Sequence, residues 1–194
     1  MNDEALKLDP ARCALIVLDL QNDVIIEGGA FAESGSPEHA KEQNVVENVK
    51  ALADVCRRVG IPVIHVHYVV EEGAPGLKLN APLFQAVKDA GGLVRGTWGA
   101  APADGLESEA GDLVVEKMRM NAFHGTRLDT ILRGLGTETL VITGAWTILR
   151  RALSSSARTI ALIWNGSRID AMKFRPLCAL LPLTLASFRR RPVK

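Results

Sequence analysis

The sequence predicts a single α/β domain of three layers, in which helices cover both faces of a doubly wound, mostly parallel β-sheet. Continuously apolar runs, typical of strands buried on both faces, alternate with stretches of helical periodicity. The 194 residues suffice for one domain with its own core. Hydrophobic residues make up 47% of the chain and charged residues 23%, as in ordinary globular proteins. We therefore expect one domain over residues 1–194.

The first half of the chain contains one strand–helix–strand unit. The apolar run 13–18 ends at Asp19 and is typical of a buried parallel strand. Ser36 as N-cap and Pro37 at the first helical position then predict one amphipathic helix that continues to Gly60. The β-branched run 61–70 predicts the second strand, which completes a βαβ unit.

The second half begins with a long excursion. Residues 71–111 are rich in Gly, Pro and Ala, and we expect a loop there with a short helix around 83–87. A strand over 112–117, a helix over 126–132 and a strand over 139–144 follow. In such an α/β sheet the reactive groups lie at the carboxyl ends of the strands.

Charge and composition exclude several classes of function. The net charge is +1, which gives no overall basic footprint for nucleic acid. No apolar run approaches the ~18–20 residues of a membrane span, and the N-terminus is acidic where a signal peptide would be basic. Three scattered cysteines, Cys13, Cys56 and Cys178, favour a reducing cytoplasm over a disulfide framework. We expect a cytoplasmic protein that binds neither nucleic acid nor a membrane.

The last 47 residues differ from the rest. Residues 148–194 carry ten basic side chains and one acid, Asp170, and are rich in Leu, Arg, Ala and Ser. One reading is a basic arm that attracts phosphate on RNA or on an acidic membrane. The segment has neither interleaved aromatic residues nor a recognisable nucleic-acid-binding module, so we do not favour that reading.

Two charged residues follow predicted strands and are candidates for catalysis. Asp19 comes directly after the first strand, Lys117 ends the third, and residues 144–147 follow the fourth. A carboxylate and an ammonium group in a partly dry cleft perturb each other's pKa values and can serve as a base and a fixed cation. The alternative is that Asp19 caps a turn and Lys117 is a solvated strand end.

Four strings in order make the sequence resemble a known family: ALIVLDLQND (14–23), GTWGA (96–100), VEKMRMNAFHGTRLD (115–129) and LVITGAWT (140–147). They resemble the isochorismatase-like cysteine hydrolases, and among these the amidases that act on carbamoyl and ureido compounds. The resemblance covers about the first 147 residues. It implies a three-layer fold with Rossmann-like topology, a small amide or ureido substrate, no cofactor, and a homo-oligomer, either dimer or tetramer.

The resemblance also implies a catalytic triad of Asp, Lys and Cys. Asp19 matches the family's base and Lys117 its lysine, while a cis peptide near the oxyanion site would fall at Ala145–Trp146. In that family a thiolate attacks the amide carbonyl, the amine leaves, and water hydrolyses the thioester. Gln21, Trp98, Phe123 and Trp146 are candidates for the substrate pocket, although plain core packing explains an aromatic residue equally well.

This sequence departs from the family at the nucleophile. Counting from Thr147 places the expected cysteine at Arg150, and aligning on the SSAR string at 155–158 places it at Ala152. The serines at 154–156 are poor substitutes, because a hydroxyl needs a dedicated base and their spacing is wrong. We expect Cys13 and Cys56 to be core residues and Cys178 to be an inert buried or tail cysteine.

Two histidines on one strand raise the question of a metal site. His65 and His67 are two residues apart and so lie on the same face of a strand, which suits metal binding. Histidines in strands are more often packed and hydrogen-bonded than metal-bound, and we predict no metal site.

The sequence thus predicts a cysteine hydrolase that cleaves a C–N bond, with the nucleophilic cysteine missing. The competing hypothesis is a catalytically inactive scaffold that keeps the family fold for binding or oligomerisation, with a basic tail as partner arm. Our preferred interpretation of residues 148–194 is a shifted reading frame or a divergent gene end, because acids vanish abruptly after a well-matched motif.

Overall fold

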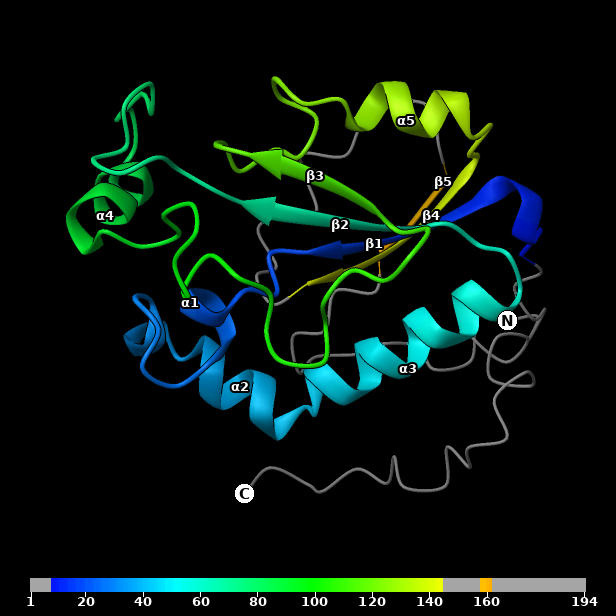
Figure 1. Cartoon of the computed structure of the whole chain (residues 1–194), viewed down its shortest axis with the longest axis horizontal. Coiled ribbons are helices and arrows are strands. Elements are labelled where there is room, and N and C mark those ends of the chain that lie inside the picture. The colour runs from blue at the N-terminus through cyan, green and yellow to red at the C-terminus, as the bar shows by residue number, and fades with distance from the viewer. Residues whose placement is uncertain (1–7, 145–157, 162–194) are drawn as a thin grey trace, which may run out of the picture.

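The computed structural model describes residues 8–144 and 158–161, and its centre is a five-stranded parallel sheet (Figure 1). The strand order is β3-β2-β1-β4-β5, which confirms the doubly wound α/β prediction. The strands are β1 (Cys13–Leu18), β2 (Val63–Tyr68), β3 (Leu113–Lys117), β4 (Thr139–Gly144) and β5 (Arg158–Ala161). The α-helices are α1 (Asn22–Ile25), α2 (Ser36–Glu42), α3 (Val45–Arg58), α4 (Pro82–Ala90) and α5 (Leu128–Gly134), and two short 3₁₀ helices cover Pro10–Arg12 and Ala32–Ser34.

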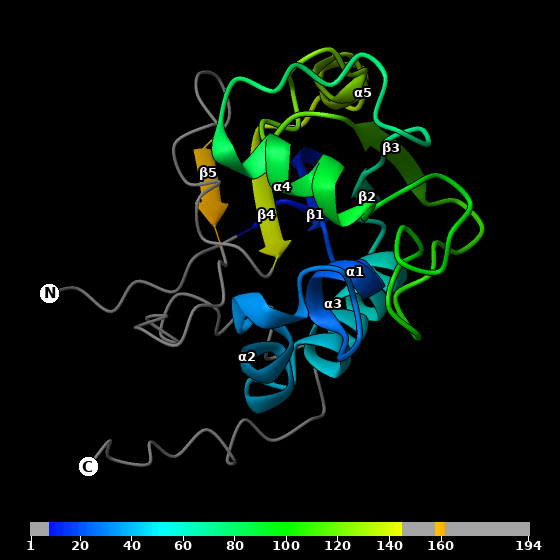
Figure 2. The same ribbon diagram turned by 90° about the vertical axis from the view of Figure 1, so that its left-hand side faces the viewer.

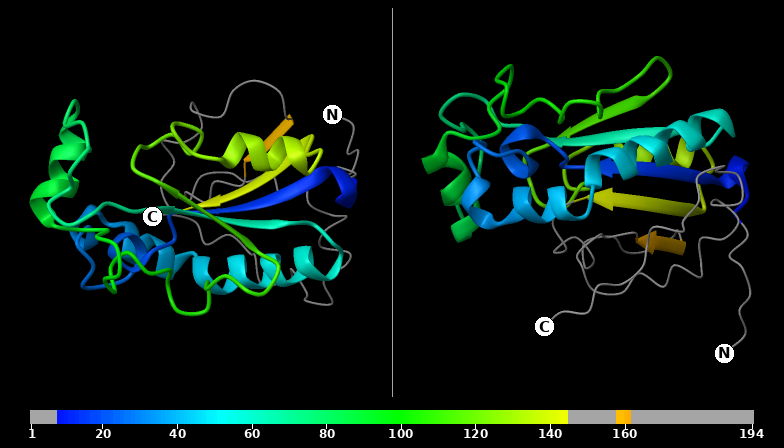
Figure 3. Two further views of the ribbon diagram at one scale, coloured as in Figure 1. Left: turned by 45° about the horizontal axis from the view of Figure 1, so that its top comes forward. Right: turned by 90° about the horizontal axis from the view of Figure 1, so that it is seen from below.

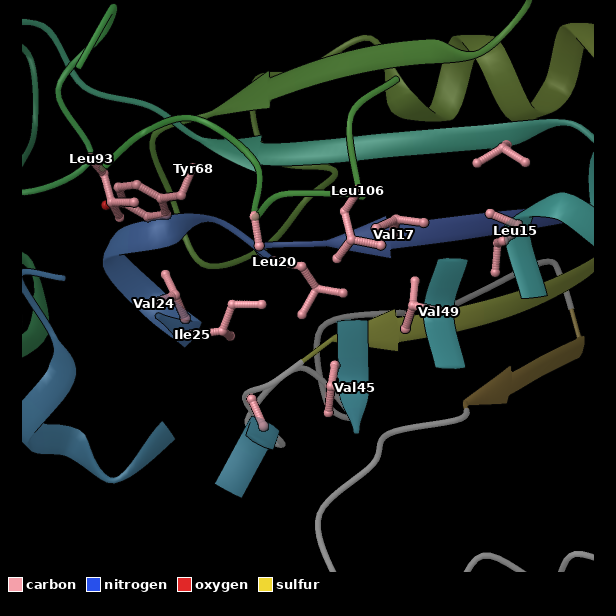
Figure 4. Close-up of a cluster of buried hydrophobic side chains, with 14 of the residues drawn as sticks. Leu15, Val17, Leu20, Val24, Ile25, Val45, Val49, Tyr68, Leu93 and Leu106 are labelled. Carbon is pink, nitrogen blue, oxygen red and sulfur yellow. The ribbon is translucent and has the colours of Figure 1, made fainter. Parts of the chain in front are cut away.

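Helices cover both faces of the sheet and form the three predicted layers (Figures 1 and 3). On one face, Val45 and Val49 of α3 pack with Leu15 and Val17 of β1 (Figure 4). On the other face, α5 contributes Leu128 and Leu132 to a second apolar cluster. All six residues of β1 are buried, because this central strand has a helical layer on each side. No helix in the described part of the chain is long and apolar enough to cross a bilayer.

The helix predicted from Ser36 to Gly60 is two helices, so that prediction was wrong. Gly35 rather than Ser36 is the N-cap residue of α2. The helix is interrupted between α2 and α3 at Asn44, whose φ is 53°. Asparagine tolerates this left-handed conformation better than most residues, and the side chain of Asn48 donates to the carbonyl of Gln43 (2.9 Å) across the break. The apolar spacing carried no sign of the interruption.

The excursion over residues 71–111 contains the predicted short helix, α4, and returns to the carboxyl ends of the strands. It joins the sheet edge through bridges between Val70 and Val94 and between Gln21 and Pro102. Figure 1 shows α1 and α4 beyond the arrowheads of β1 and β2, and Figure 2 views the molecule from that side.

The side chain of Asp23 holds this loop in place by hydrogen bonds. Its two carboxylate oxygens accept hydrogen bonds from the backbone N–H of Ala30 (2.9 Å) and of Leu93 (2.6 Å). A Cβ on Gly99 would overlap the carboxylate, which these two bonds hold in place.

Gly99→Ala is therefore expected to destabilise the fold by about 1–3 kcal/mol, the usual cost of overpacking. Urea unfolding measures the change. Gly134→Ala is the matched control, because nothing lies within 4 Å of a Cβ there and alanine favours a helix by up to about 1 kcal/mol. Equal stability of the Gly99 variant and the unmodified chain would contradict the described packing around Asp23.

Candidate active site

The sheet brings Asp19 and Lys117 together. β1 and β3 both pair in parallel with β2, with Leu18 opposite Val66 and Lys117 opposite Tyr68. The ends of the two strands therefore lie at one edge, and Lys117 Nζ lies 2.8 Å from Asp19 Oδ2. The Lys117 side chain is fully buried and that of Asp19 is 10% exposed. The predicted meeting of these residues is confirmed as geometry.

Asp19 leaves the strand in an unusual backbone conformation. Its φ is 54°, in the left-handed region, where a residue other than glycine costs roughly 1 kcal/mol or more. Its N–H still donates to the carbonyl of Val66 (2.9 Å), so Asp19 adopts the left-handed conformation while it remains hydrogen-bonded to β2. Strained residues of this kind cluster at functional sites, and this one carries the candidate base.

The surroundings of Asp19 suit a base. Burial raises the pKa of its carboxyl group, and the neighbouring ammonium group of Lys117 limits that rise. Lys117 also donates to the carbonyl of Met120 (3.2 Å) and lies 5.1 Å from the centre of the Tyr68 ring. Asp19 Oδ1 is buried and has no hydrogen-bond partner among the described residues. The site thus combines an unused acceptor oxygen with a fixed cation.

The side chain of Gln21 connects the segments around the Asp19–Lys117 pair by hydrogen bonds. Its Nε2 donates to the carbonyls of Tyr68 (2.9 Å) and Ala100 (2.7 Å), and its Oε1 accepts from the N–H of Tyr68 (2.8 Å). The side chain is fully buried, and both amide donors are used. These bonds join the end of β1 to the end of β2 and to the loop that carries Ala100, so Gln21 positions the site.

A groove of about 1020 Å³ opens beside Lys117. It is lined by residues that follow β3, among them Met120, Asn121 and His124, and by residues between 69 and 84. The sequence analysis assigned no role to Asn121 or His124, although both lie within the motif 115–129. They line a groove because the 69–84 segment packs beside them.

Two of the three predicted aromatic pocket residues lie away from this groove, and the third, Trp146, is outside the described residues. Trp98 is 56% exposed and does not line this groove. It also does not line a second, small cavity, whose wall includes Asp19 and Tyr68. Phe123 packs against the apolar cluster on the α5 face of the sheet. Neither placement supports contact with a substrate bound next to Lys117.

Ala145, Trp146, Arg150 and Ala152 lie outside the described residues. The strand that leads to them is described: Gly144 ends β4 opposite Leu18, one residue before Asp19. Gly144, the last described residue of β4, therefore lies at the same edge of the sheet as the Asp19–Lys117 pair.

The two described cysteines do not supply a nucleophile. Cys13 begins β1 and is separated from Asp19 by the length of the strand, roughly 20 Å. Cys56 is fully buried in α3, and burial raises the pKa of its thiol to about 12. Both are core residues, as predicted from the sequence, whereas Cys178 lies outside the described residues.

His65 belongs to a charged network away from the Asp19–Lys117 pair. Its Nε2 lies 3.1 Å from Asp112 Oδ2, and the Asp112 carboxylate also accepts from Arg57 Nη2 (2.6 Å) and from the N–H of Glu109 (2.9 Å). Among the described residues, no group of three His, Cys, Asp or Glu could hold a metal ion. The network joins α3 to the start of β3, which is a structural role.

Acid is expected to destabilise the fold through His67. Burial lowers its pKa from the usual 6.5 to about 4. The unfolded chain therefore binds a proton first, so the stability from neutral His67 is complete above pH 6.5 and is lost as the pH falls to about 4. We expect a loss of about 1–3 kcal/mol between pH 7 and 4.5 by urea unfolding, and a smaller loss in His67→Gln. Equal acid sensitivity of the two proteins would contradict this assignment.

Comparisons with known proteins agree with this architecture. The isochorismatase domain model matches residues 13–149. Ureidoacrylate amidohydrolase RutB of Rhizobium rhizogenes strain K84 is 33% identical over 153 residues, covering 73% of this chain and 62% of that protein. The chain thus matches less than two thirds of the length of that relative.

Two solved structures are similar to the chain. An isochorismatase family protein from Burkholderia thailandensis has a TM-score of 0.61 at 26% identity, covering 88% of this chain and 87% of that one. N-carbamoylsarcosine amidase from Thermoplasma acidophilum has a TM-score of 0.52 at 28% identity, covering 69% and 67%. Because the family model covers well over half of the sequence and the sheet carries the paired Asp19 and Lys117, this chain belongs to the isochorismatase family.

Proposed function

We propose that the site is that of a hydrolase for the C–N bond of a small amide, carbamoyl or ureido compound. The observation that carries the proposal is the buried Asp19–Lys117 pair, 2.8 Å apart, in which the second oxygen of Asp19 has no hydrogen-bond partner within the described part of the chain. The names of two relatives, ureidoacrylate amidohydrolase and N-carbamoylsarcosine amidase, support the substrate class.

Each group has a role in this reaction. Asp19 takes the proton from a thiol held at the sheet edge, and Lys117 stabilises the anionic groups beside it. The thiolate attacks the carbonyl carbon, and backbone N–H groups at Ala145–Trp146 hold the oxyanion. The C–N bond breaks as Asp19 passes the proton it took from the thiol to the leaving amine, and water then hydrolyses the thioester to the acid and the free thiol.

The thiol is the missing part. Its position falls on Arg150 or Ala152, and the cysteines of the chain are Cys13, Cys56 and Cys178. We therefore expect the chain with this sequence to hydrolyse amides at a very low rate.

The absent thiol also favours a second candidate function. The family fold would then be a non-catalytic scaffold that binds a small ligand or a second copy of itself, with residues 148–194 as a basic partner arm. On either reading we expect a cytoplasmic dimer or tetramer that binds neither nucleic acid nor a membrane, and size-exclusion chromatography with light scattering measures the assembly.

Restoring a thiol separates the two functions. Arg150→Cys and Ala152→Cys are assayed for ammonia release from a panel of amide, carbamoyl and ureido compounds, with Arg151→Cys as the matched control. We expect one of the first two variants to hydrolyse a member of the panel and the control to match the unmodified chain. No activity in either variant would overturn the hydrolase proposal and favour the scaffold.

Peptide mapping across residues 140–194, together with the intact mass, checks the sequence around the positions of the cysteine variants. A mass that matches the printed sequence confirms that the thiol is missing. A different C-terminus with a cysteine near position 150 would make the unmodified chain the active enzyme.

A further inference from the structure

Tyr68 has a buried hydroxyl group that the reaction above does not use. The residue ends β2 and is 3% exposed, and its hydroxyl has no hydrogen-bond partner among the described residues. Figure 4 shows its side chain among apolar neighbours, next to Leu93. A buried tyrosine hydroxyl usually has a partner, because leaving it without one costs the free energy of removing it from water.

Asp19 Oδ1 is a second buried polar atom for which the described residues offer no partner. Asp19 and Tyr68 line the same small cavity. The rest of its wall is apolar and consists of Val24, Phe31, Leu83, Val87, Leu93 and Met120. The cavity leaves about 10 Å³ for the centre of a water molecule, which is about the space that one water needs.

We propose that this cavity binds one water molecule, which accepts a hydrogen bond from the Tyr68 hydroxyl and donates one to Asp19 Oδ1. Tyr68 is then a positioning residue for the base, and this role rests on the proposed function. No other described polar side chain lines the cavity, so these two groups are the partners that the water has there.

The bridge fits the chemistry of the base. A carboxylate oxygen accepts two hydrogen bonds, so the water leaves one acceptor position on Oδ1 for the proton of the nucleophile. Hydrogen bonding to the charged form favours ionised Asp19 and opposes the effect of its burial. Lys117 already holds Oδ2, so the water and the lysine together fix the orientation of the whole carboxylate.

Three measurements on the full chain test the proposal without any need for hydrolysis. The first is a high-resolution crystal structure, in which we expect a water within hydrogen-bond distance of both oxygens. The second is thermal unfolding of Tyr68→Phe, in which we expect the Tm to fall by about 2–4 °C from the loss of one hydrogen bond. The third is the carbon-13 NMR titration of the Asp19 carboxyl group, whose midpoint we expect to rise by about one pH unit in Tyr68→Phe.

Val87→Ala is the matched control, because it enlarges the same cavity but keeps both polar groups. It should lower the Tm and leave the Asp19 midpoint in place. A cavity without water density, or an unchanged Asp19 midpoint in Tyr68→Phe, would overturn the proposal, as would a higher Tm in that variant. Failure of the cysteine variants to hydrolyse amides would overturn the proposed function but leave these results as they are.

Discussion

Lys117→Met is expected to destabilise the fold by about 3–5 kcal/mol. The substitution keeps an unbranched apolar stem but removes the ammonium group that lies 2.8 Å from the buried carboxylate of Asp19. The remaining carboxylate must then stay charged without a partner or take up a proton, and either outcome costs free energy. Urea unfolding at pH 7 measures the loss.

An exposed ion pair provides the control. Arg133 and Asp129 lie 2.7 Å apart with side chains 69% and 55% exposed, so Arg133→Met should leave the stability nearly unchanged. The double variant Lys117→Met, Asp19→Asn should recover part of the loss, because no unpaired charge remains. Equal effects of the Lys117 and Arg133 substitutions would contradict the burial of the pair.

The loss in Lys117→Met also depends on pH in a defined direction. Burial raises the pKa of Asp19, and removal of the lysine raises it further. A raised pKa in the folded chain means that the fold is favoured below that pKa and disfavoured above it. The loss of unfolding free energy in Lys117→Met, relative to the unmodified chain, should therefore shrink as the pH is lowered from 7. A loss that is constant with pH would argue against a charged Asp19.

In a chain with a restored thiol, Asp19→Asn is expected to lower the rate of amide hydrolysis by roughly 10²–10⁴-fold. An amide cannot accept the proton of the nucleophile, although it has nearly the same size as the carboxylate. The measurement is kcat/KM for the substrate that the Arg150→Cys or Ala152→Cys chain hydrolyses, with folding of each variant checked by circular dichroism.

Asp129→Asn in the same background is the matched control. Asp129 is an exposed acid on α5 that pairs with Arg133, and its exchange should leave the rate unchanged. If Asp19→Asn retained the full rate of the restored chain, Asp19 would not be the base. Arg151→Cys with the same substrate excludes a rate that comes from any added thiol.

The sequence by itself determined four of the five described strands and the place of the candidate base and the lysine, whereas β5 was not predicted. A run such as residues 13–18 is apolar without alternation, so it must be buried on both faces, and that local signal needs no knowledge of its neighbours. Asp19 follows such a run and Lys117 ends β3, and parallel pairing with β2 then brings them to one edge.

Only the tertiary structure decided how that edge is built. The three hydrogen bonds of Gln21 join segments 47 and 79 residues apart in the chain. The cavity beside Tyr68 likewise needs α1, α4 and the loops around them to close against the end of β2. Backbone periodicity reports which face of an element is buried, whereas the partner of a buried polar atom is set by long-range packing, which leaves no local pattern in the sequence.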